Sequence, residues 1–279
     1  MNEPRRALAA SILVVLLSAS ASIGLAYVAE RSAPPPRPTS RGQGLRAGPE
    51  PMQIAGSGAN IRLTRHLLEE LPGVRVHDSV GSGGGLHALQ DGVIDIALLS
   101  RPLRPREAEG IESTAYARTP LVWALQGPPR DVTEDELAGW YAGEGDVLPL
   151  LRELGDSAIS EVRAASPAIA NAHDEAARAG RAEILLTDEA MLRAVAQIDA
   201  AFGLTDLGQI RLAELPLSPL SVDGVEPTIE NARGGRYPYV RTLYAATREG
   251  DTRAQALVQL LTAEVARRDL EALGYWGLP

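Results

Sequence analysis

The first part of the globular chain repeats one order of apolar and polar segments. A short apolar stretch, Met52 to Ala55, predicts a strand, and a glycine-rich turn follows it directly. Apolar residues then recur at near-helical spacing from Ile61 to Leu71. Val74 to Val80 alternates apolar and polar residues, and the glycine-rich segment Gly81 to Gly85 comes next. Val93 to Leu99 is apolar except for Asp95, like a buried parallel strand. This β-loop-α, β-loop-α, β order is typical of an α/β fold.

Later segments are more helical in pattern. Expected helices are Thr133 to Tyr141, Pro167 to Ala179, Asp188 to Ala196 and Thr252 to Leu273. No internal repeat with a fixed period is visible in the sequence. The length of 279 residues and the hydrophobic content of 45% are enough for two lobes, each with its own core.

The N-terminal part differs from the rest. Arg5 and Arg6 precede an uncharged stretch rich in Leu, Val, Ala and Ser from Ala7 to Ala29, which is the pattern of an export signal. Its length fits either a cleaved signal peptide or an uncleaved membrane anchor, and both remain open. We assign residues 1–30 to this signal peptide or signal anchor, and residues 31–51, rich in Pro and Gly, to a tether. The body is then expected in the periplasm or another extracytoplasmic space, either free or tethered to the inner membrane by residues 7–29.

Composition narrows the classes of partner and chemistry. The formal net charge of −9 argues against nucleic-acid binding through a broad basic surface. Lys is absent, and the planar group of Arg suits bidentate contact with phosphate or carboxylate. Cys is absent as well, which excludes disulfides, thiolate catalysis and cysteine-bound zinc. The four His residues lack metal-ligand spacing, and no nucleophile with a base stands out, so we expect no enzyme activity, no metal and no cofactor.

Two glycine-rich loops stand between a predicted strand and a predicted helix. Backbone N–H groups at a helix start lack partners within the helix, and the helix dipole favours negative charge there. In the first loop Asn60 can cap the helix and Ile61 can offer its amide. In the second loop Ser82 supplies a hydroxyl, and Gly83 lets the backbone approach a ligand closely. The loops indicate an anion site, although each residue alone can also be a plain helix cap.

Several motifs, taken together, resemble one known family. They are Ile54-Ala55-Gly56-Ser57-Gly58-Ala59, Gly81-Ser82-Gly83-Gly84-Gly85 with Asp91-Gly92-Val93-Ile94-Asp95-Ile96-Ala97, Ser100-Arg101-Pro102-Leu103, Ala201-Phe202-Gly203-Leu204, Val222-Asp223-Gly224-Val225-Glu226-Pro227-Thr228, Tyr237-Pro238-Tyr239-Val240-Arg241-Thr242-Leu243-Tyr244 and Leu273-Gly274-Tyr275. In these motifs and in their order the chain resembles a divergent member of the periplasmic phosphate-binding proteins of ABC phosphate transporters. The resemblance covers most of residues 52–279.

The resemblance implies an α/β, two-lobe periplasmic-binding-protein fold, with a mixed sheet in each lobe and a hinge of two crossovers. Residues 52–124 and 206–279 would form lobe one, and residues 125–205 would form lobe two. Proteins of this kind close their lobes on a ligand. The implied partners are inorganic phosphate or a related oxyanion, the permease of an ABC transporter, and the membrane through the N-terminal segment.

Transferred position by position, the resemblance places a ligand site on both lobes. The expected ligand-binding residues are Asn60, Ile61, Ser82, Gly83, Ser100, Arg101, Arg163 and Ser166. Ser100 stands where the family usually carries an aspartate that accepts a hydrogen bond from protonated phosphate, and Arg101 follows it. The family's lobe-two arginine and Gly-Ser-Gly-Thr loop have only a poor counterpart here, in the segment 163–167. Two functions therefore remain open: capture of phosphate or a similar tetrahedral oxyanion for uptake, and a membrane-anchored, ligand-free module for signalling or interaction.

Overall fold

A mixed β-sheet organises the chain, whose residues 50–268 and 270–278 are described by the computed structural model. The strands are β1 (Met52–Gly56), β2 (Val74–Ser79), β3 (Ile96–Leu99), β4 (Ile111–Gln126), β5 (Asp131–Val132), β6 (Leu148–Leu151), β7 (Glu183–Ile184), β8 (Ala201–Asp206), β9 (Leu217–Pro219), β10 (Ser221–Val222) and β11 (Val240–Arg248). The main sheet has the order β2-β1-β3-β11-β4-β8-β6-β7, with β9 paired to β4, while β5 and β10 form a separate pair. Parallel and antiparallel pairs both occur, so the expectation of an α/β fold with mixed strands is confirmed.

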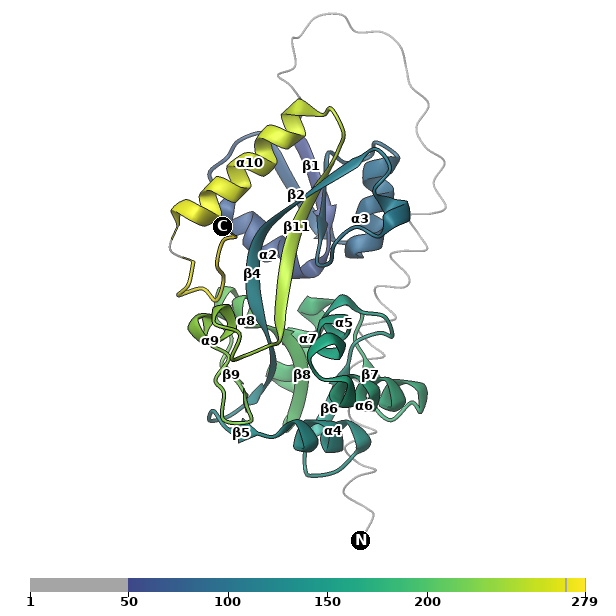
Figure 1. The fold of residues 1–279 in the computed structure, drawn as a ribbon, viewed down its shortest axis with the longest axis vertical. Coiled ribbons are helices and arrows are strands. Elements are labelled where there is room, and N and C mark those ends of the chain that lie inside the picture. Colours follow the sequence, from purple (N-terminus) through teal and green to yellow (C-terminus); the bar gives the residue numbers. More distant parts are fainter. Residues whose placement is uncertain (1–49, 269, 279) are drawn as a thin grey trace, which may run out of the picture. The chain divides into compact units, whose positions relative to one another are not determined.

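Helices connect these strands and cover the sheet (Figure 1). They are α2 (Gly58–Leu67), α3 (Gly81–Gln90), α4 (Glu134–Ala142), α5 (Ser157–Ala165), α6 (Pro167–Arg178), α7 (Asp188–Gln197), α8 (Leu207–Leu212), α9 (Ile229–Arg233) and α10 (Thr252–Arg267), with a 3-10 turn at Pro105–Glu107. The helices expected over residues 133–141, 167–179 and 188–196 are confirmed within two residues at each end. The last helix is shorter than expected, because α10 ends at Arg267.

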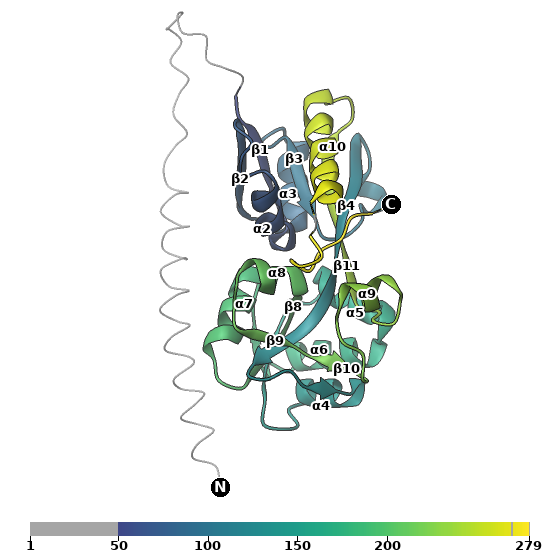
Figure 2. The same ribbon diagram turned by 90° about the vertical axis from the view of Figure 1, so that its left-hand side faces the viewer.

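Two long strands, β4 and β11, join the two ends of the sheet (Figures 1 and 2). β4 has sixteen residues; it pairs with β11 up to Pro120 and with β8 from Leu121. We call β1, β2, β3, α2, α3 and α10 the β1–β3 half, and β6, β7, β8 and α4 to α7 the β6–β8 half. Strand β4 contributes to both halves, because its first part pairs with β11, which pairs with β3, and its last part pairs with β8.

Buried hydrophobic clusters support both halves. In the β1–β3 half, α2 and α10 cover one face of the sheet through residues such as Leu63 and Leu257, and α3 covers the other face through Leu89. In the β6–β8 half, Trp123 and Phe202 centre one cluster, and Met191 contributes to the cluster beneath α7. Residues Pro49–Pro279 together form one compact unit, which we expect to fold independently. The lobe boundaries expected from the sequence remain a prediction.

The helix starts near the two glycine-rich loops differ from the expectation. Helix α2 begins at Gly58 with Ser57 as the N-cap residue, so Asn60 lies inside the first turn and is not the cap. Helix α3 already begins at Gly81, and the glycine-rich segment is therefore its first turn and not a loop. Glycine permits this because a Cβ on Gly85 would lie 2.7 Å from Gly56 Cα, a contact that real Cβ atoms do not make.

The expected export signal and tether, residues 1–30 and 31–51, lie outside the described residues except for their last two positions. Among residues 50–268 and 270–278, none of the helices has both the length and the apolar character needed to cross a membrane.

Candidate anion-binding site

Four serine hydroxyls meet where the two halves approach each other, and we call them the serine cluster. Ser57 Oγ donates to Ser100 Oγ at 3.0 Å. Ser82 Oγ lies 3.3 Å from Ser100 Oγ and also accepts the backbone N–H of Ser100 at 3.2 Å. Ser157 Oγ, from the β6–β8 half, lies 2.8 Å from Ser100 Oγ. Ser100 therefore connects three chain segments that are far apart in the sequence.

The position of each serine in its element explains why the hydroxyls meet. Ser57 is the N-cap residue of α2, Ser82 lies in the first turn of α3, and Ser157 is the first residue of α5. Ser100 directly follows β3, which runs parallel to β1. The carboxyl ends of parallel strands share one edge of a sheet, and the helices that follow them begin there. Three helix N-termini, each with a partial positive charge, thus converge on Ser100.

A buried group of charges lies beside the serine cluster, and we call Arg152, Asp156, Asp188, Asp206 and Arg241 the ionic cluster. Arg152 Nη2 lies 2.9 Å from Asp156 Oδ2 and 3.9 Å from Asp188 Oδ2. Arg241 Nη1 lies 2.8 Å from Asp206 and 3.3 Å from Asp188, while its Nη2 lies 3.9 Å from Asp156. Three carboxyl groups therefore share two guanidinium groups.

The pKa values of two of these carboxyl groups shift in opposite directions. Burial raises the pKa of Asp206 to about 7, against the effect of Arg241, and the negative charges of Asp188 and Asp156 add to the rise. Burial also acts to raise the pKa of Asp156, but Arg152 and Arg241 outweigh it and hold that pKa below its usual value. At neutral pH Asp156 is therefore ionised between the two guanidinium groups, whereas Asp206 is only partly ionised.

Two of the carboxylates occupy places that an anion would also favour. Asp156 is the N-cap of α5 and accepts the N–H of Ala158 at 2.8 Å. Asp188 is the first residue of α7, and a Cβ on Gly58 would lie 2.6 Å from its Oδ2, so this carboxylate lies against the start of α2. The chain thus supplies part of the negative charge that converging helix N-termini favour.

Arg152 nevertheless keeps one free donor. Its Nη1 is buried and has no hydrogen-bond partner within residues 50–268 and 270–278. The backbone N–H of Arg152 donates to His173 Nε2 at 3.1 Å, and His173 Nδ1 lies 3.3 Å from Asp174 Oδ1. Burial lowers the pKa of His173, which fits a neutral ring that accepts at Nε2 and donates from Nδ1. The His173 ring thereby fixes the backbone that carries the guanidinium group.

Not all of the expected site residues in the β1–β3 half point toward the serine cluster. Ser82 and Ser100 belong to it, and Gly83 is exposed in the first turn of α3 beside Ser82. The Asn60 side chain is fully buried and donates to Leu99 O at 3.2 Å and to the Tyr116 hydroxyl at 3.1 Å. Its side chain therefore fastens α2 to the sheet. Its backbone N–H donates to Ser57 O at 3.1 Å, so the donors of Asn60 have partners within the chain.

The two remaining residues expected in the β1–β3 half also have other partners. The Ile61 side chain is buried in a hydrophobic cluster, and because α2 begins at Gly58 the Ile61 backbone N–H lies beyond those that a helix start leaves unpaired. The Arg101 guanidinium makes a bidentate contact with Glu107 at 2.6 and 2.8 Å. Its charge is thus paired within the β1–β3 half.

The two residues expected in the β6–β8 half make their contacts away from the serine cluster. Arg163 donates to Asn171 at 2.8 Å and to Asp174 at 2.7 Å. Ser166 is buried and donates to Glu134 at 2.6 Å. The structure therefore does not bring Arg163 and Ser166 to the serines, and it places Arg152, Asp156 and Ser157 there instead.

The sequence contains a signal for the missed segment. Leu148 to Leu151 is a short apolar run, and Gly155-Asp156-Ser157 combines a turn glycine with a good N-cap residue. This repeats the strand-loop-helix order of the first two loops. The Ser166-Pro167 start attracts attention because both residues suit a helix start, but α6 directly follows α5 rather than a strand. A helix that does not follow a strand does not begin at the edge of the sheet.

Comparison with known sequences and structures defines the class of protein. The family model for the PBP superfamily domain matches residues 33–265. The chain therefore belongs to the PBP superfamily, which is a fold of solute-binding proteins. No curated protein sequence matches it.

Solved structures give the same fold at low sequence identity. A protein from Clostridium perfringens, described as a phosphate ABC transporter substrate-binding protein with bound phosphate, is 18% identical with a TM-score of 0.67, over 82% of this chain and 100% of that one. An ABC-type phosphate transport receptor from Vibrio cholerae is 20% identical with a TM-score of 0.57, over 82% and 100%. The CcmR regulatory domain from Synechocystis PCC6803, in complex with 2-PG, is 16% identical with a TM-score of 0.50, over 77% and 96%. These likenesses establish the periplasmic-binding-protein type of fold.

Proposed function

We propose that this chain is an extracytoplasmic solute-binding protein that captures phosphate or a similar tetrahedral oxyanion, for uptake through an ABC-type transporter. The serine cluster is the observation that carries the proposal. Its hydroxyls hydrogen-bond mainly to one another at three helix N-termini, and an oxyanion would accept hydrogen bonds from the same groups. The guanidinium of Arg152 pairs with Asp156, the residue before Ser157, and its free Nη1 is a further charged donor.

The carboxylates of the ionic cluster set a condition on the ligand. An anion that enters beside Asp156 and Asp188 is repelled by carboxylate oxygens, unless it carries a proton that it can donate to one of them in a hydrogen bond. Hydrogen phosphate has such a proton, and sulfate at neutral pH has none. We therefore expect phosphate to be preferred over sulfate, although Ser100 replaces the aspartate usual in the phosphate-binding family.

Two likenesses add support to a transport role. The Clostridium perfringens protein is described as binding phosphate for an ABC transporter, and the Vibrio cholerae protein is described as a phosphate transport receptor. The proposal places residues 7–29 as the signal or anchor that brings this unit across the inner membrane. Division into two lobes, as expected from the sequence, would let the serine cluster open for ligand entry.

A second function is favoured by one specific observation. Ser100 and Ser157 contact each other directly at 2.8 Å, and Asp156 already occupies the N-terminus of α5. A chain that closes on its own side chains needs no ligand, and it would act as a membrane-anchored module for signalling or interaction. The CcmR domain is an example of this fold in a regulatory protein.

Calorimetric titration separates the two functions. The Pro49–Pro279 unit is titrated with phosphate and sulfate, and Ser82→Ala and Arg152→Met are compared with the wild type. For oxyanion capture we expect saturable phosphate binding that each variant weakens by roughly tenfold or more, since each removes a donor to a charged ligand. Arg163→Met is the matched control, because Arg163 pairs with Asp174 and should leave affinity unchanged. Absence of heat with both anions, for a protein whose circular dichroism shows it folded, would exclude capture of these anions and leave the module.

A further inference from the structure

The sheet has an edge that its own chain leaves open. Residues 111–117 of β4 pair with β11 on one side, and no strand among residues 50–268 and 270–278 pairs with them on the other. An unpaired strand edge presents free backbone N–H and C=O groups that can pair with another extended chain. Glu112 and Thr114 are exposed on this stretch and Ser113 and Ala115 are partly exposed, so residues 112–115 are its accessible part.

The chain itself demonstrates that this edge accepts a partner. Arg118 exchanges backbone hydrogen bonds with Trp276 at 2.8 and 3.0 Å, in the antiparallel sense. This single bridge lies at the end of the open stretch and does not extend along it. The unpaired backbone N–H and C=O groups of residues 111–117 therefore lie next to those of Arg118, which already pair with Trp276.

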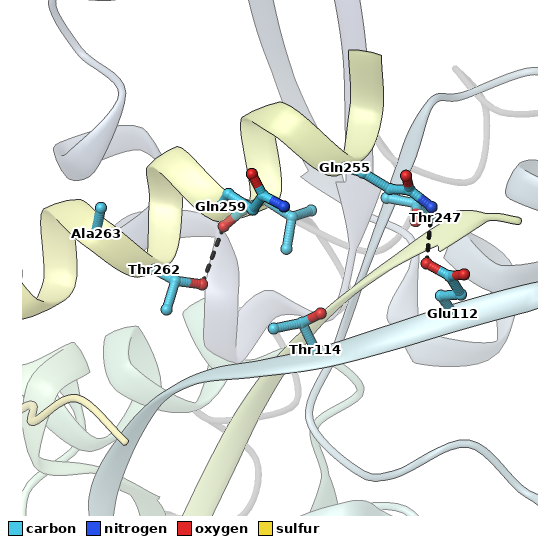
Figure 3. A pocket seen from close by; sticks show the side chains of 8 residues that line it. Glu112, Thr114, Thr247, Gln255, Gln259, Thr262 and Ala263 are labelled. Carbon is cyan, nitrogen blue, oxygen red and sulfur yellow. Dashed lines mark hydrogen bonds between the residues drawn. The ribbon is translucent and has the colours of Figure 1, made fainter. Parts of the chain in front are cut away.

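A cavity of about 490 Å³ adjoins the open edge (Figure 3). Helix α10 forms one wall, and the strands β4 and β11 form the other. Its lining residues are Glu112, Thr114, Thr247, Gln255, Val258, Gln259, Thr262 and Ala263. A strand edge next to a helix-walled cavity can hold a peptide backbone at the edge and alternate side chains in the cavity.

The lining defines the chemistry of the occupant. Thr and Gln side chains offer hydrogen bonds without charge, and Glu112 is the one charged residue among those that line this cavity. Glu112 Oε2 accepts a hydrogen bond from Gln255 at 2.7 Å, and the carboxylate still faces the cavity region. A basic side chain is therefore the complementary group. A second copy of this chain is a poor occupant, because the formal charge of −9 on each copy opposes association.

We propose that an extended peptide segment of another protein, carrying a basic side chain, binds here by adding a strand to β4 at residues 111–117. Its backbone pairs with the open edge, and its alternate side chains enter the cavity beneath α10. Its Lys or Arg contacts Glu112. This site is separate from the serine cluster, so the proposal does not depend on the proposed oxyanion function.

The test uses defined peptides on the Pro49–Pro279 unit. The probe is a fluorescein-labelled octapeptide that alternates Thr and Val and has one central Arg; one twin carries Glu in its place, and another carries two Pro residues. Fluorescence anisotropy should show saturable binding of the Arg peptide, weaker binding of the Glu twin, and none of the Pro twin, because Pro removes backbone donors. Hydrogen exchange should slow in residues 111–117 when the Arg peptide binds.

Two variants locate the site. Glu112→Lys should weaken the Arg peptide by about three- to tenfold and strengthen the Glu twin, as expected for reversing one exposed ion pair. Ala263→Trp, at an exposed position on α10, should fill the cavity and weaken both peptides by roughly tenfold. Glu183→Lys is the matched control, because Glu183 is an exposed carboxylate on β7 at the opposite edge of the sheet.

Three outcomes would overturn the proposal. The first is no saturable binding of the Arg peptide. The second is binding that Glu112→Lys and Ala263→Trp leave unchanged, or that slows hydrogen exchange elsewhere. The third is a wild-type dimer in sedimentation that Ala263→Trp dissociates, since this would identify a second copy as the occupant.

Discussion

Replacing Arg241 by Met is expected to destabilise the protein strongly at neutral pH. The Arg241 side chain is 2% exposed, and Asp206, its nearest partner at 2.8 Å, is 0% exposed. Arg152 remains close to Asp156 and Asp188 in the variant, whereas no other ion pair to Asp206 is present in the described part of the chain. The substitution therefore leaves one buried carboxyl group without its cation.

The magnitude follows from the burial of this pair. Removal of one partner from a buried ion pair typically costs about 3–5 kcal/mol of folding free energy, and we expect this range for Arg241→Met at pH 8. The pKa of Asp206, already raised to about 7 by burial, should rise further in the variant, because Arg241 is the cation that lowers it. One pKa unit corresponds to about 1.4 kcal/mol, and pH 8 lies about one unit above the wild-type pKa of Asp206, so the cost should be smaller at pH 5 by up to about that amount.

Urea unfolding followed by tryptophan fluorescence measures these free energies, with the wild type and the variant compared at pH 5 and pH 8. Arg236→Met is the control, because Arg236 pairs with Glu230 on the surface and its loss should cost less than about 0.5 kcal/mol. The double variant Arg241→Met/Asp206→Asn should recover part of the loss. A cost below about 1 kcal/mol at pH 8, or an equal cost at both pH values, would refute the reasoning about the ionic cluster.

Three further predictions concern stability. Asp206 has a raised pKa in the folded protein, so its contribution to folding stability is fully present below the unfolded pKa of about 4 and is lost as the pH rises through about 7. The free energy of unfolding, measured across this pH window, should therefore fall less steeply with pH for Asp206→Asn than for the wild type. Gly208→Ala should destabilise by about 1–3 kcal/mol in thermal unfolding, because its Cβ would lie 2.0 Å from the Tyr275 ring, whereas Gly83→Ala, whose Cβ meets no atom within 4 Å, should be neutral or stabilise by up to about 1 kcal/mol. Thr133→Ala removes the side chain that caps α4 and should cost about 1 kcal/mol by urea unfolding, and an unchanged midpoint would contradict the role of that cap.

Local patterns were sufficient to predict much of the fold. The strand and helix order of residues 52–99 follows from apolar runs and glycine positions, because strands and helices there succeed one another at short range. The pairing of β4 with both β11 and β8 could not be predicted in this way. Long-range pairing depends on which surfaces are complementary in three dimensions, and the alternation along one strand does not specify its neighbour.

The candidate site was predictable in one half and not in the other. Ser82 and Ser100 each follow or begin a recognisable element, and the structure brings them together. Asn60 was expected at the N-cap, but Ser57, three residues earlier, is the N-cap residue, and Asn60 lies inside the first turn with its side chain buried. Arg152 has no local signature, because its role depends on the partners Asp156 and Asp188, and Asp188 lies thirty-six residues away.

The continuous strand β4 limits where this chain can be cut or joined to another. Because its first part completes one half of the sheet and its last part completes the other, a cut at any position along it leaves both fragments with an unsatisfied edge. Neither half can then serve as a portable module. Gene fusions and rearrangements that retain function should therefore join outside residues 111–126, and limited proteolysis within that range should release no stable fragment.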